Sequence, residues 1–227
     1  MEQLDIQNQN LQDPNGFAIQ SGDNSKESQC VCLYANYYKI PRKFFGKASD
    51  VPKNWVAVGS VRWAEEVMGK VVAPDYYPVF LTEWVKRKVW RQDKWPYGSR
   101  VFIKPADAHK RFTGFVTTGT WKGKKKAPYW CSEIVKFTNE WRYYISNGKV
   151  IAAKWGCGIE DVELPAPSLY INWPADFCGA VDFGSYENGE IALIESNSPF
   201  SCGWYGTLTE YEIYTKWLIE GWKYSTK

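Results

Sequence analysis

The sequence predicts an α+β fold, and three observations support that class. Two segments before residue 99, at 61–68 and 79–92, have patterns typical of helices. From residue 100 onward the pattern changes to short apolar runs separated by turn residues, which indicates strands. A last helical pattern spans about 208–222. The 227 residues suffice for one two-lobed domain or two small ones, with a buried core.

The first 29 residues have the composition of a polar, flexible arm. They contain six Gln and four Asn but no Trp or Tyr, and five acids against one Lys give a charge of −4. A helical or strand patch around Phe17–Ile19 remains open. The net charge of the whole chain is +3, so the residues after 29 together carry +7. That excess suits an anionic ligand but is too small by itself to argue for nucleic acid.

A smaller α/β lobe is expected over residues 30–99. Ser60 is suited to cap a helix at 61–68 and Gly69 to end it, because a serine hydroxyl accepts from helix N–H groups and glycine tolerates a left-handed cap. The expected elements are strands at 30–36 (CVCLYAN), 53–58 and 71–73, and helices at 61–68 and 79–92.

Residues 100–227 form the larger, β-rich region. The pair Asn147-Gly148 is the strongest short hairpin signal, because both residues tolerate the positive φ of a tight turn. The expected strands lie at 100–105, 114–119, 129–135, 140–146, 149–155, 177–184 and 191–197.

Three oxygen-bearing side chains fall on the last predicted hairpin. Asp182 lies in one apolar strand, and Glu195 and Asn197 close the next. Residues two apart in a strand face the same side, and Asp182 can lie across the ladder from them. Such a set is costly between apolar neighbours without a cation. Mg²⁺ takes carboxylate and amide oxygens and shares its shell with nucleotide phosphates, so the pattern points to an ATP-using enzyme.

Three cations lie on the strands that precede this hairpin. Lys104 ends a strand and is suited either to hold a phosphate oxygen or to stay exposed. Arg142 and Lys154 lie on the two strands of the Asn-Gly hairpin, where an inward guanidinium needs an anion. They can stabilise a transferring phosphoryl group or form a cross-strand salt bridge. The basic loop at 117–126 can close over a triphosphate or remain a solvated turn.

A strand that exits into a linker at Glu133 is suited to nucleotide contacts. The backbone of Ile134 and Val135 can meet an adenine edge, and Glu140 can accept from ribose hydroxyls. The alternative for Glu133 is an exposed strand carboxylate.

Several classes of protein are excluded by composition. There is no apolar run of about 18 residues for a membrane span, and the first residues lack the features of a secretory signal. Six scattered cysteines and the single His109 make no zinc pattern. A reducing, cytoplasmic compartment is expected.

The order of these residues resembles the ATP-grasp superfamily of carboxylate–amine ligases. The resemblance rests on VFIKP, SEIV with Glu140 seven residues after Glu133, VDFG and LIESN, above all on the thirteen-residue step from Asp182 to Glu195 and the ExN ending. The segments VGSVRWAEE, DYYPVFL, EWRYYI and NGKVIAA are most similar to the R-two-K clade of phages and bacteria. The resemblance covers about residues 50–205.

This resemblance implies two α/β lobes with ATP held between β-rich subdomains, and an ATP-dependent ligase that joins a carboxylate to an amine or thiol through an acyl phosphate. The acceptor would be a small molecule, peptide or protein, and a phage-encoded chain would act in the host cytoplasm. The implied ATP contacts are Lys104 for the phosphates, Glu133, Ile134 and Val135 for adenine, and Glu140 for ribose. The implied Mg²⁺ ligands are Asp182, Glu195 and Asn197, and the implied catalytic cations are Arg142 and Lys154.

One departure from the family pattern concerns charge. Many members carry an arginine two residues before the metal aspartate, where this chain has Ala180. The missing cation must then come from Arg142 or Lys154, and extra positive charge from Arg62, Arg87 and Arg91.

Two interpretations of another class stay open. Lys104 could form a lysyl-adenylate, although the glycine expected after it is missing. The aromatic and basic residues of 84–95 could instead stack single-stranded nucleic acid, or they could form a core-facing stripe with a solvated basic face.

Overall fold

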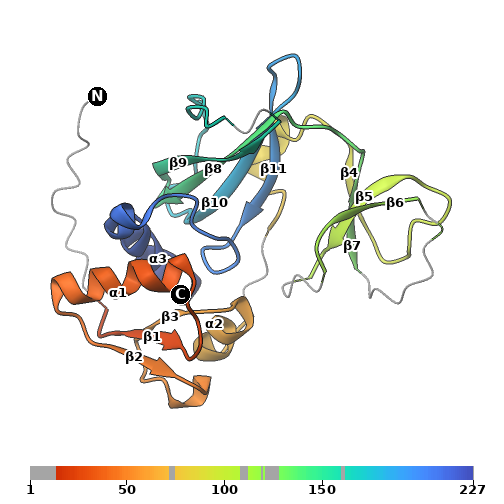
Figure 1. Cartoon of the computed structure of the whole chain (residues 1–227). Coiled ribbons are helices and arrows are strands. Elements are labelled where there is room, and N and C mark those ends of the chain that lie inside the picture. The colour runs from red at the N-terminus through yellow and green to blue at the C-terminus, as the bar shows by residue number, and fades with distance from the viewer. Residues whose placement is uncertain are drawn as a thin grey trace.

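The computed structural model describes residues 14–71, 75–107, 112–118, 120, 128–159 and 162–226. Figure 1 shows three sheets side by side: a three-stranded sheet among helices, a central four-stranded sheet, and a second four-stranded sheet at the far end. No helix in the described part of the chain is long and apolar enough to cross a bilayer.

The three-stranded sheet is parallel, with the order β2-β1-β3. Its strands are β1 (Phe17–Gln20), β2 (Arg42–Phe45) and β3 (Val56–Val58). Phe17 and Ile19 pack with α1 (Lys26–Tyr38) and α3 (Tyr211–Thr226), whereas Ala18 packs with α2 (Val61–Met68). Because alternate residues of a strand face opposite sides, α1 and α3 cover one face of the sheet and α2 covers the other.

The strand expected at 30–36 is wrong, because these residues lie inside α1. The Ser25 hydroxyl accepts from the Ser28 N–H and begins this helix. Cys30, Val31, Tyr34 and Ala35 are buried at spacings of three and four, which is the helical period. Residues 17–20 and 26–29, expected within a flexible arm, belong to β1 and α1.

The helix at 61–68 has the predicted ends, since Ser60 caps α2 and Gly69 closes it at φ 70°. The helix expected over 79–92 is wrong in its second half. Val79–Trp84 form a 3₁₀-helix (η2), the chain turns at Lys86 with φ 48°, and Val89–Gln92 form strand β4. Pairing of β4 with β7 outweighs the local helical pattern.

The two four-stranded sheets are antiparallel, with the orders β4-β7-β5-β6 and β11-β10-β8-β9. The predicted strands of this region are present, but the one expected at 129–135 ends at Ser132, so residues 133–135 lie in the linker to β8. Asn147 and Gly148 have the positive φ of the expected turn. The further bounds are β5 Val101–Pro105, β6 Phe115–Thr117, β7 Tyr129–Ser132, β8 Asn139–Ser146, β9 Lys149–Gly158, β10 Gly179–Ser185 and β11 Ile191–Asn197. A 3₁₀-helix, η3 (Leu208–Glu210), precedes the closing helix.

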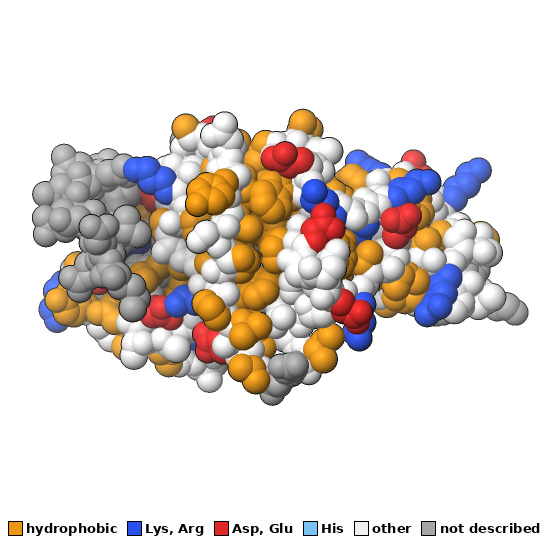
Figure 2. Space-filling model, turned by 90° about the horizontal axis from the view of Figure 1, so that it is seen from above, with side chains coloured by type: hydrophobic (Ala, Val, Ile, Leu, Met, Phe, Trp, Pro, Cys, Tyr) orange, Lys and Arg blue, Asp and Glu red, His pale blue; other side chains and the backbone are white. Residues whose placement is uncertain are grey.

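One face of the central sheet is apolar, whereas the other face is apolar in one part and polar in the other. Val181, Phe183 and Leu193 lie on the apolar face, in a buried cluster with Leu81 of η2. On the other face, Tyr144 and Ala180 pack with α3, but the neighbouring positions carry polar side chains. The candidate site occupies this uncovered part of the face. The space-filling view shows apolar side chains in the middle of the molecule and several Lys and Arg side chains at the end that holds β4–β7 (Figure 2).

Three predicted features fall wholly or mainly outside the described residues. These are the strand at 71–73, the basic loop at 117–126, and His109.

Candidate functional site

The β10–β11 hairpin brings its three polar residues together as predicted. Asp182 pairs with Glu195 across the ladder, and Asn197 pairs with Ala180, so all three lie on one face. Asn197 Nδ2 donates to Asp182 Oδ2 at 3.3 Å and to Glu195 Oε1 at 3.0 Å. A β-bulge follows Asp182, a feature that re-aims side chains at many active sites.

Arg142 on β8 neutralises Asp182 through two parallel hydrogen bonds. Nε donates to Oδ1 and Nη2 to Oδ2, each at 2.7 Å, and both residues are only 7% exposed. Burial alone would lower the pKa of Arg142, but its hydrogen bonds to Asp182 outweigh that effect and raise it above the ordinary value. The guanidinium therefore remains a permanent cation, and its centre lies 4.1 Å from the ring of Tyr205.

Lys104 joins the two four-stranded sheets at this site. It lies on β5 and its Nζ donates to Glu195 Oε2 on β11 at 2.8 Å. The same ammonium is 4.0 Å from the ring centre of Tyr76 and 4.7 Å from that of Tyr77. An ammonium has three N–H donors, so Lys104 can hold Glu195 and a second anion at once.

Lys154 lies beside Arg142 but takes a different partner. The two residues pair across β8 and β9, yet Lys154 Nζ donates to Glu210 Oε1 in η3. Burial alone would raise the pKa of Glu210, but hydrogen bonds from Lys154 and the Thr207 backbone lower it. Lys154 is therefore next to the carboxylate set without being bonded to it.

Glu140 lies on the same face of β8 as Arg142, two residues before it. Burial raises its pKa first of all, and the nearby charge of Asp182 adds to this, whereas a hydrogen bond from Cys157 acts in the opposite direction. Glu140 is thus a half-buried carboxyl on the same face of the sheet as Arg142 and Asp182.

The linker between β7 and β8 begins at Glu133, which bonds Lys88 twice. The Lys88 N–H donates to Glu133 Oε2 at 2.9 Å, and the Glu133 N–H donates to the Lys88 carbonyl at 3.1 Å. Glu133 and Ile134 are exposed and Val135 is half-buried. Glu133 is therefore engaged with its own chain through one oxygen, and the structure does not bring it to the carboxylate set.

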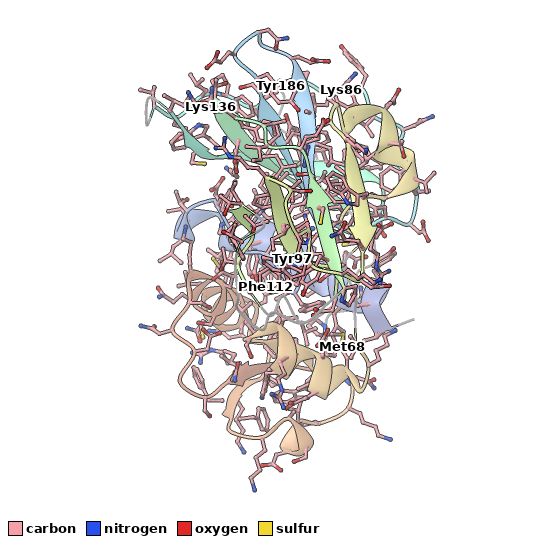
Figure 3. The ribbon with its side chains drawn as sticks, turned by 90° about the vertical axis from the view of Figure 1, so that its right-hand side faces the viewer. Met68, Lys86, Tyr97, Phe112, Lys136 and Tyr186 are labelled. Carbon is pink, nitrogen blue, oxygen red and sulfur yellow. The ribbon has the colours of Figure 1, made fainter. Side chains whose placement is uncertain are left out.

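Aromatic residues frame the far end of this linker. Phe137 stacks on Tyr186 with ring centres 5.2 Å apart, and Arg87 lies 5.6 Å from the Phe137 ring. Arg87 also donates to the carbonyls of Leu193 and Ile194 on β11. Lys86, Lys136 and Tyr186 lie at the same end of the molecule in Figure 3. Arg87 thus holds β11, an edge strand of the central sheet. Arg62, in contrast, forms an exposed ion pair with Glu66 on α2.

Residues 203–210, which follow β11 and are called the strap below, connect the site to α1. The Gly203 carbonyl accepts from Arg142 Nη1 at 3.0 Å and from the Tyr144 hydroxyl at 2.8 Å. From the other side, Glu27 accepts from the Trp204 N–H at 2.6 Å. Sequence reasoning missed this strap and the aromatic contacts of Tyr76 and Tyr205, because their partners are far away in the chain.

The position that carries arginine in many family members cannot do so here. Ala180 is 0% exposed and lies in the core with Tyr144 and Trp217, below α3. Arg142 supplies a guanidinium from the neighbouring strand instead, directly opposite Asp182. A buried guanidinium is therefore present beside Asp182 although position 180 is alanine.

The donor set of Asp182, Glu195 and Asn197 fits Mg²⁺ in its chemistry. Two carboxylates and an amide offer hard oxygen ligands, and Mg²⁺ uses few protein ligands when phosphate oxygens complete its shell. A metal would take Oδ1 of Asn197, which belongs to the same amide group as the donating Nδ2. Nowhere in the described residues do three His, Cys, Asp or Glu side chains gather as metal ligands would. Within this donor set, the third ligand would be the amide of Asn197.

Comparison with known proteins places the chain in a family. A model for the ATP-grasp domain, family 2 of the R-two-K clade, matches residues 78–213, more than half of the chain. No curated protein matches the sequence.

Several solved structures share the fold at low sequence identity. N5-carboxyaminoimidazole synthase from Aspergillus clavatus is 9% identical with a TM-score of 0.54, over 90% of this chain and 77% of that one. The synthetase of that name from Staphylococcus aureus is 8% identical with a TM-score of 0.54, over 91% and 77%. D-alanine–D-alanine ligase from Bacillus anthracis is 11% identical with a TM-score of 0.51, over 92% and 97%.

Proposed function

The chain belongs to family 2 of the R-two-K clade of ATP-grasp domains, and from that premise we propose that it is an ATP-dependent ligase that joins a carboxylate to an amine. One observation supports this most strongly: Lys104 and Arg142 each hold one of the two carboxylates that converge on the β10–β11 hairpin. Three kinds of group needed for phosphoryl transfer, namely carboxylates, an amide and cations, thus meet in one place.

The two ion pairs balance the charges of the two carboxylates. Mg²⁺ would be held by Asp182, Glu195 and Asn197, and when bound it would neutralise charge on the phosphate oxygens of ATP. Lys104 would then share its ammonium between Glu195 and a phosphate. Arg142 would turn a guanidinium N–H toward the γ-phosphate while Gly203 and Tyr205 keep it in place.

The nucleotide base would lie against the linker between β7 and β8. Its edge would meet the backbone of Ile134 and Val135, and Glu140 would accept from the ribose hydroxyls. Glu133, which already fixes Lys88, would shape the start of this linker. Lys154, held by Glu210, would add a second cation beside Arg142.

The proposed reaction has two steps. An oxygen of the substrate carboxylate attacks the γ-phosphorus, the bond to the bridging oxygen breaks, and ADP leaves behind an acyl phosphate. An amine nitrogen then attacks the acyl carbon, loses a proton, and phosphate departs. Here Lys104 and Arg142 act by positioning and by stabilising negative charge, because they can donate hydrogen bonds to phosphoryl oxygens throughout.

Stacking of single-stranded nucleic acid finds no support in the packing of residues 84–95. Trp84 lies 5.6 Å from Phe183 and Trp95 lies 5.7 Å from Tyr129, so both partly buried rings pack against the apolar clusters of the fold.

A trapping assay tests the proposal without knowledge of the natural amine. The chain would be incubated with ATP, Mg²⁺, hydroxylamine and a panel of amino acids and short peptides, and ADP and hydroxamate would be measured. We expect both products in equal amounts with the right carboxylate. Formation of ADP and hydroxamate should be lost in Lys104→Ala. It should be kept in Lys136→Ala, because the Lys136 side chain is 71% exposed. Release of AMP, or no hydroxamate from any acid while ATP still binds, would contradict the ligase.

A further inference from the structure

A cavity of about 570 Å³ lies beside the candidate site, between the three-stranded sheet and the chain that follows β11. Its walls come from three segments: residues 20–27 from the end of β1 into α1, residues 57–61 from the end of β3 into α2, and residues 199–203. Tyr214 and Leu218 of α3 close its base.

The topology places this cavity where α/β sheets commonly bind ligands. β1 and β3 are adjacent and parallel, and both loops that line the cavity leave from their carboxyl ends. The β1 loop leads to α1 on one face of the sheet and the β3 loop leads to α2 on the other. Diverging loops leave a crevice at such a switch point, which is a recurrent ligand site in open α/β sheets.

The polar lining favours a ligand that donates hydrogen bonds. Four N–H groups at the two helix starts, which could attract an anion, are bonded by the chain itself. Asp23 Oδ1 accepts from the Ser25 N–H at 2.9 Å, and Gln20 Oε1 accepts from the Ser60 N–H at 2.9 Å. The Ser25 and Ser60 hydroxyls take further N–H groups of α1 and α2.

The charge of the lining also favours a ligand with hydrogen-bond donors, in particular a cation. Among the described residues that line the cavity, Asp23 and Glu27 are the charged ones, and both are acids. Lys26 belongs to the same helix start, but its Nζ donates to the Trp204 and Gly206 carbonyls. Two carboxylates without a lining cation attract an ammonium and repel a carboxylate.

The cavity also shares its wall with the proposed reaction centre. Gly203 lines it, and the Gly203 carbonyl accepts from Arg142, which holds Asp182. The Glu27 carboxylate accepts a hydrogen bond from the backbone N–H of the next residue, Trp204. A molecule in the cavity is therefore separated from Arg142 by one peptide segment.

We propose that this cavity binds the amine substrate, through a cationic amine-bearing group held by Asp23 and Glu27. The role as amine substrate rests on the proposed ligase function, whereas the preference for a cation rests on the cavity alone. The carboxylate substrate would enter from elsewhere, because the acidic lining disfavours it.

Calorimetric titration without nucleotide tests this preference with two probes, lysinamide as the cation and glutarate as the anion. We expect lysinamide to bind in the millimolar range and glutarate not to bind. Binding of lysinamide should weaken about tenfold in Asp23→Asn and Glu27→Gln, since each loses one charge contact. Asparagine and glutamine keep the acceptor oxygens that the Ser25 and Trp204 N–H groups need, so both variants are expected to fold.

Two further variants sharpen the test. Ser21→Lys puts a cation at an exposed lining position and should abolish lysinamide binding, whereas Glu66→Gln on α2, outside the lining, should leave it unchanged. Tighter binding of glutarate, no binding of lysinamide, or equal binding by all variants would overturn the proposal. Binding of ATP with Mg²⁺ to the wild type is titrated separately. A wild type that binds lysinamide but not ATP would refute the ligase and not the cation preference of the cavity.

Discussion

Arg142 and Asp182 face each other on adjacent strands, and the guanidinium donates to both carboxylate oxygens at 2.7 Å. A third donor of the same guanidinium reaches the Gly203 carbonyl. One side chain thus ties a proposed metal ligand to the strap at 203–210. This explains how a chain with Ala180 at the usual arginine position can still present a buried cation beside its carboxylates.

Arg142→Ala should lower the free energy of unfolding by about 3–5 kcal/mol, because it removes the cation that neutralises the buried Asp182 carboxylate. Urea denaturation of wild type and variant measures the difference. The matched control is Arg62→Ala, which removes an exposed pair with Glu66 and should change stability by less than about 0.5 kcal/mol. Equal effects of the two substitutions would contradict the buried pair.

Ala180→Arg, which restores the common family residue, should disrupt the fold rather than improve the site. Ala180 is fully buried beside Tyr144, so the larger side chain overpacks the core and buries a charge. Thermal unfolding should show a large drop in Tm, whereas Ala175→Arg at an exposed position should unfold near the wild-type Tm. A stable Ala180→Arg protein with improved ATP turnover would refute the compensation by Arg142.

Glu140→Gln should stabilise the protein at neutral pH. Burial raises the pKa of Glu140 above its ordinary value of 4.5, so the ionised form is disfavoured in the folded state. This penalty is present above the folded pKa and disappears as the pH falls through it toward the unfolded value. The stability gain of the variant should therefore shrink in acid, as measured by urea denaturation at neutral pH and near pH 4. A gain that stays constant with pH would exclude titration of Glu140 as its source.

Tyr144→Phe should loosen the strap. The hydroxyl donates to the Gly203 carbonyl and accepts from the Tyr205 N–H, each at 2.8 Å, so its loss leaves two polar groups without this partner. We expect a loss of about 1–3 kcal/mol in stability and faster hydrogen exchange at Tyr205. Tyr170→Phe, at a side chain that is 96% exposed, serves as control. Unchanged exchange at Tyr205 would argue against the strap.

The hairpin and its polar residues could be predicted because the information is local. Alternation and a turn define the two strands and their register, which places Asp182 opposite Glu195. The cap at Ser60 and the end at Gly69 were equally visible, since each depends on residues within one helical turn. In contrast, a short apolar run such as 30–36 fits a strand or a buried helix stripe, and only its packing on α3 and the sheet decides.

The partners of the site residues depend on tertiary structure. Lys104 meets Glu195 from another sheet, 91 residues away in the chain. The sequence leaves Lys154 either facing the carboxylates or in a cross-strand salt bridge, whereas in the structure Glu210 of η3 takes its ammonium. Such pairings follow from how sheets and helices are placed in space, which no local pattern encodes.

The most direct test of the account is nucleotide binding, measured by thermal shift with ATP, with and without Mg²⁺. Wild type should gain Tm with ATP only when Mg²⁺ is present, and the gain should vanish in Asp182→Asn and Glu195→Gln. Glu187→Gln, whose side chain is 76% exposed near the β10–β11 turn, should respond like wild type. A wild type without any shift, or a shift that survives in both site variants, would contradict a metal–nucleotide site on this hairpin.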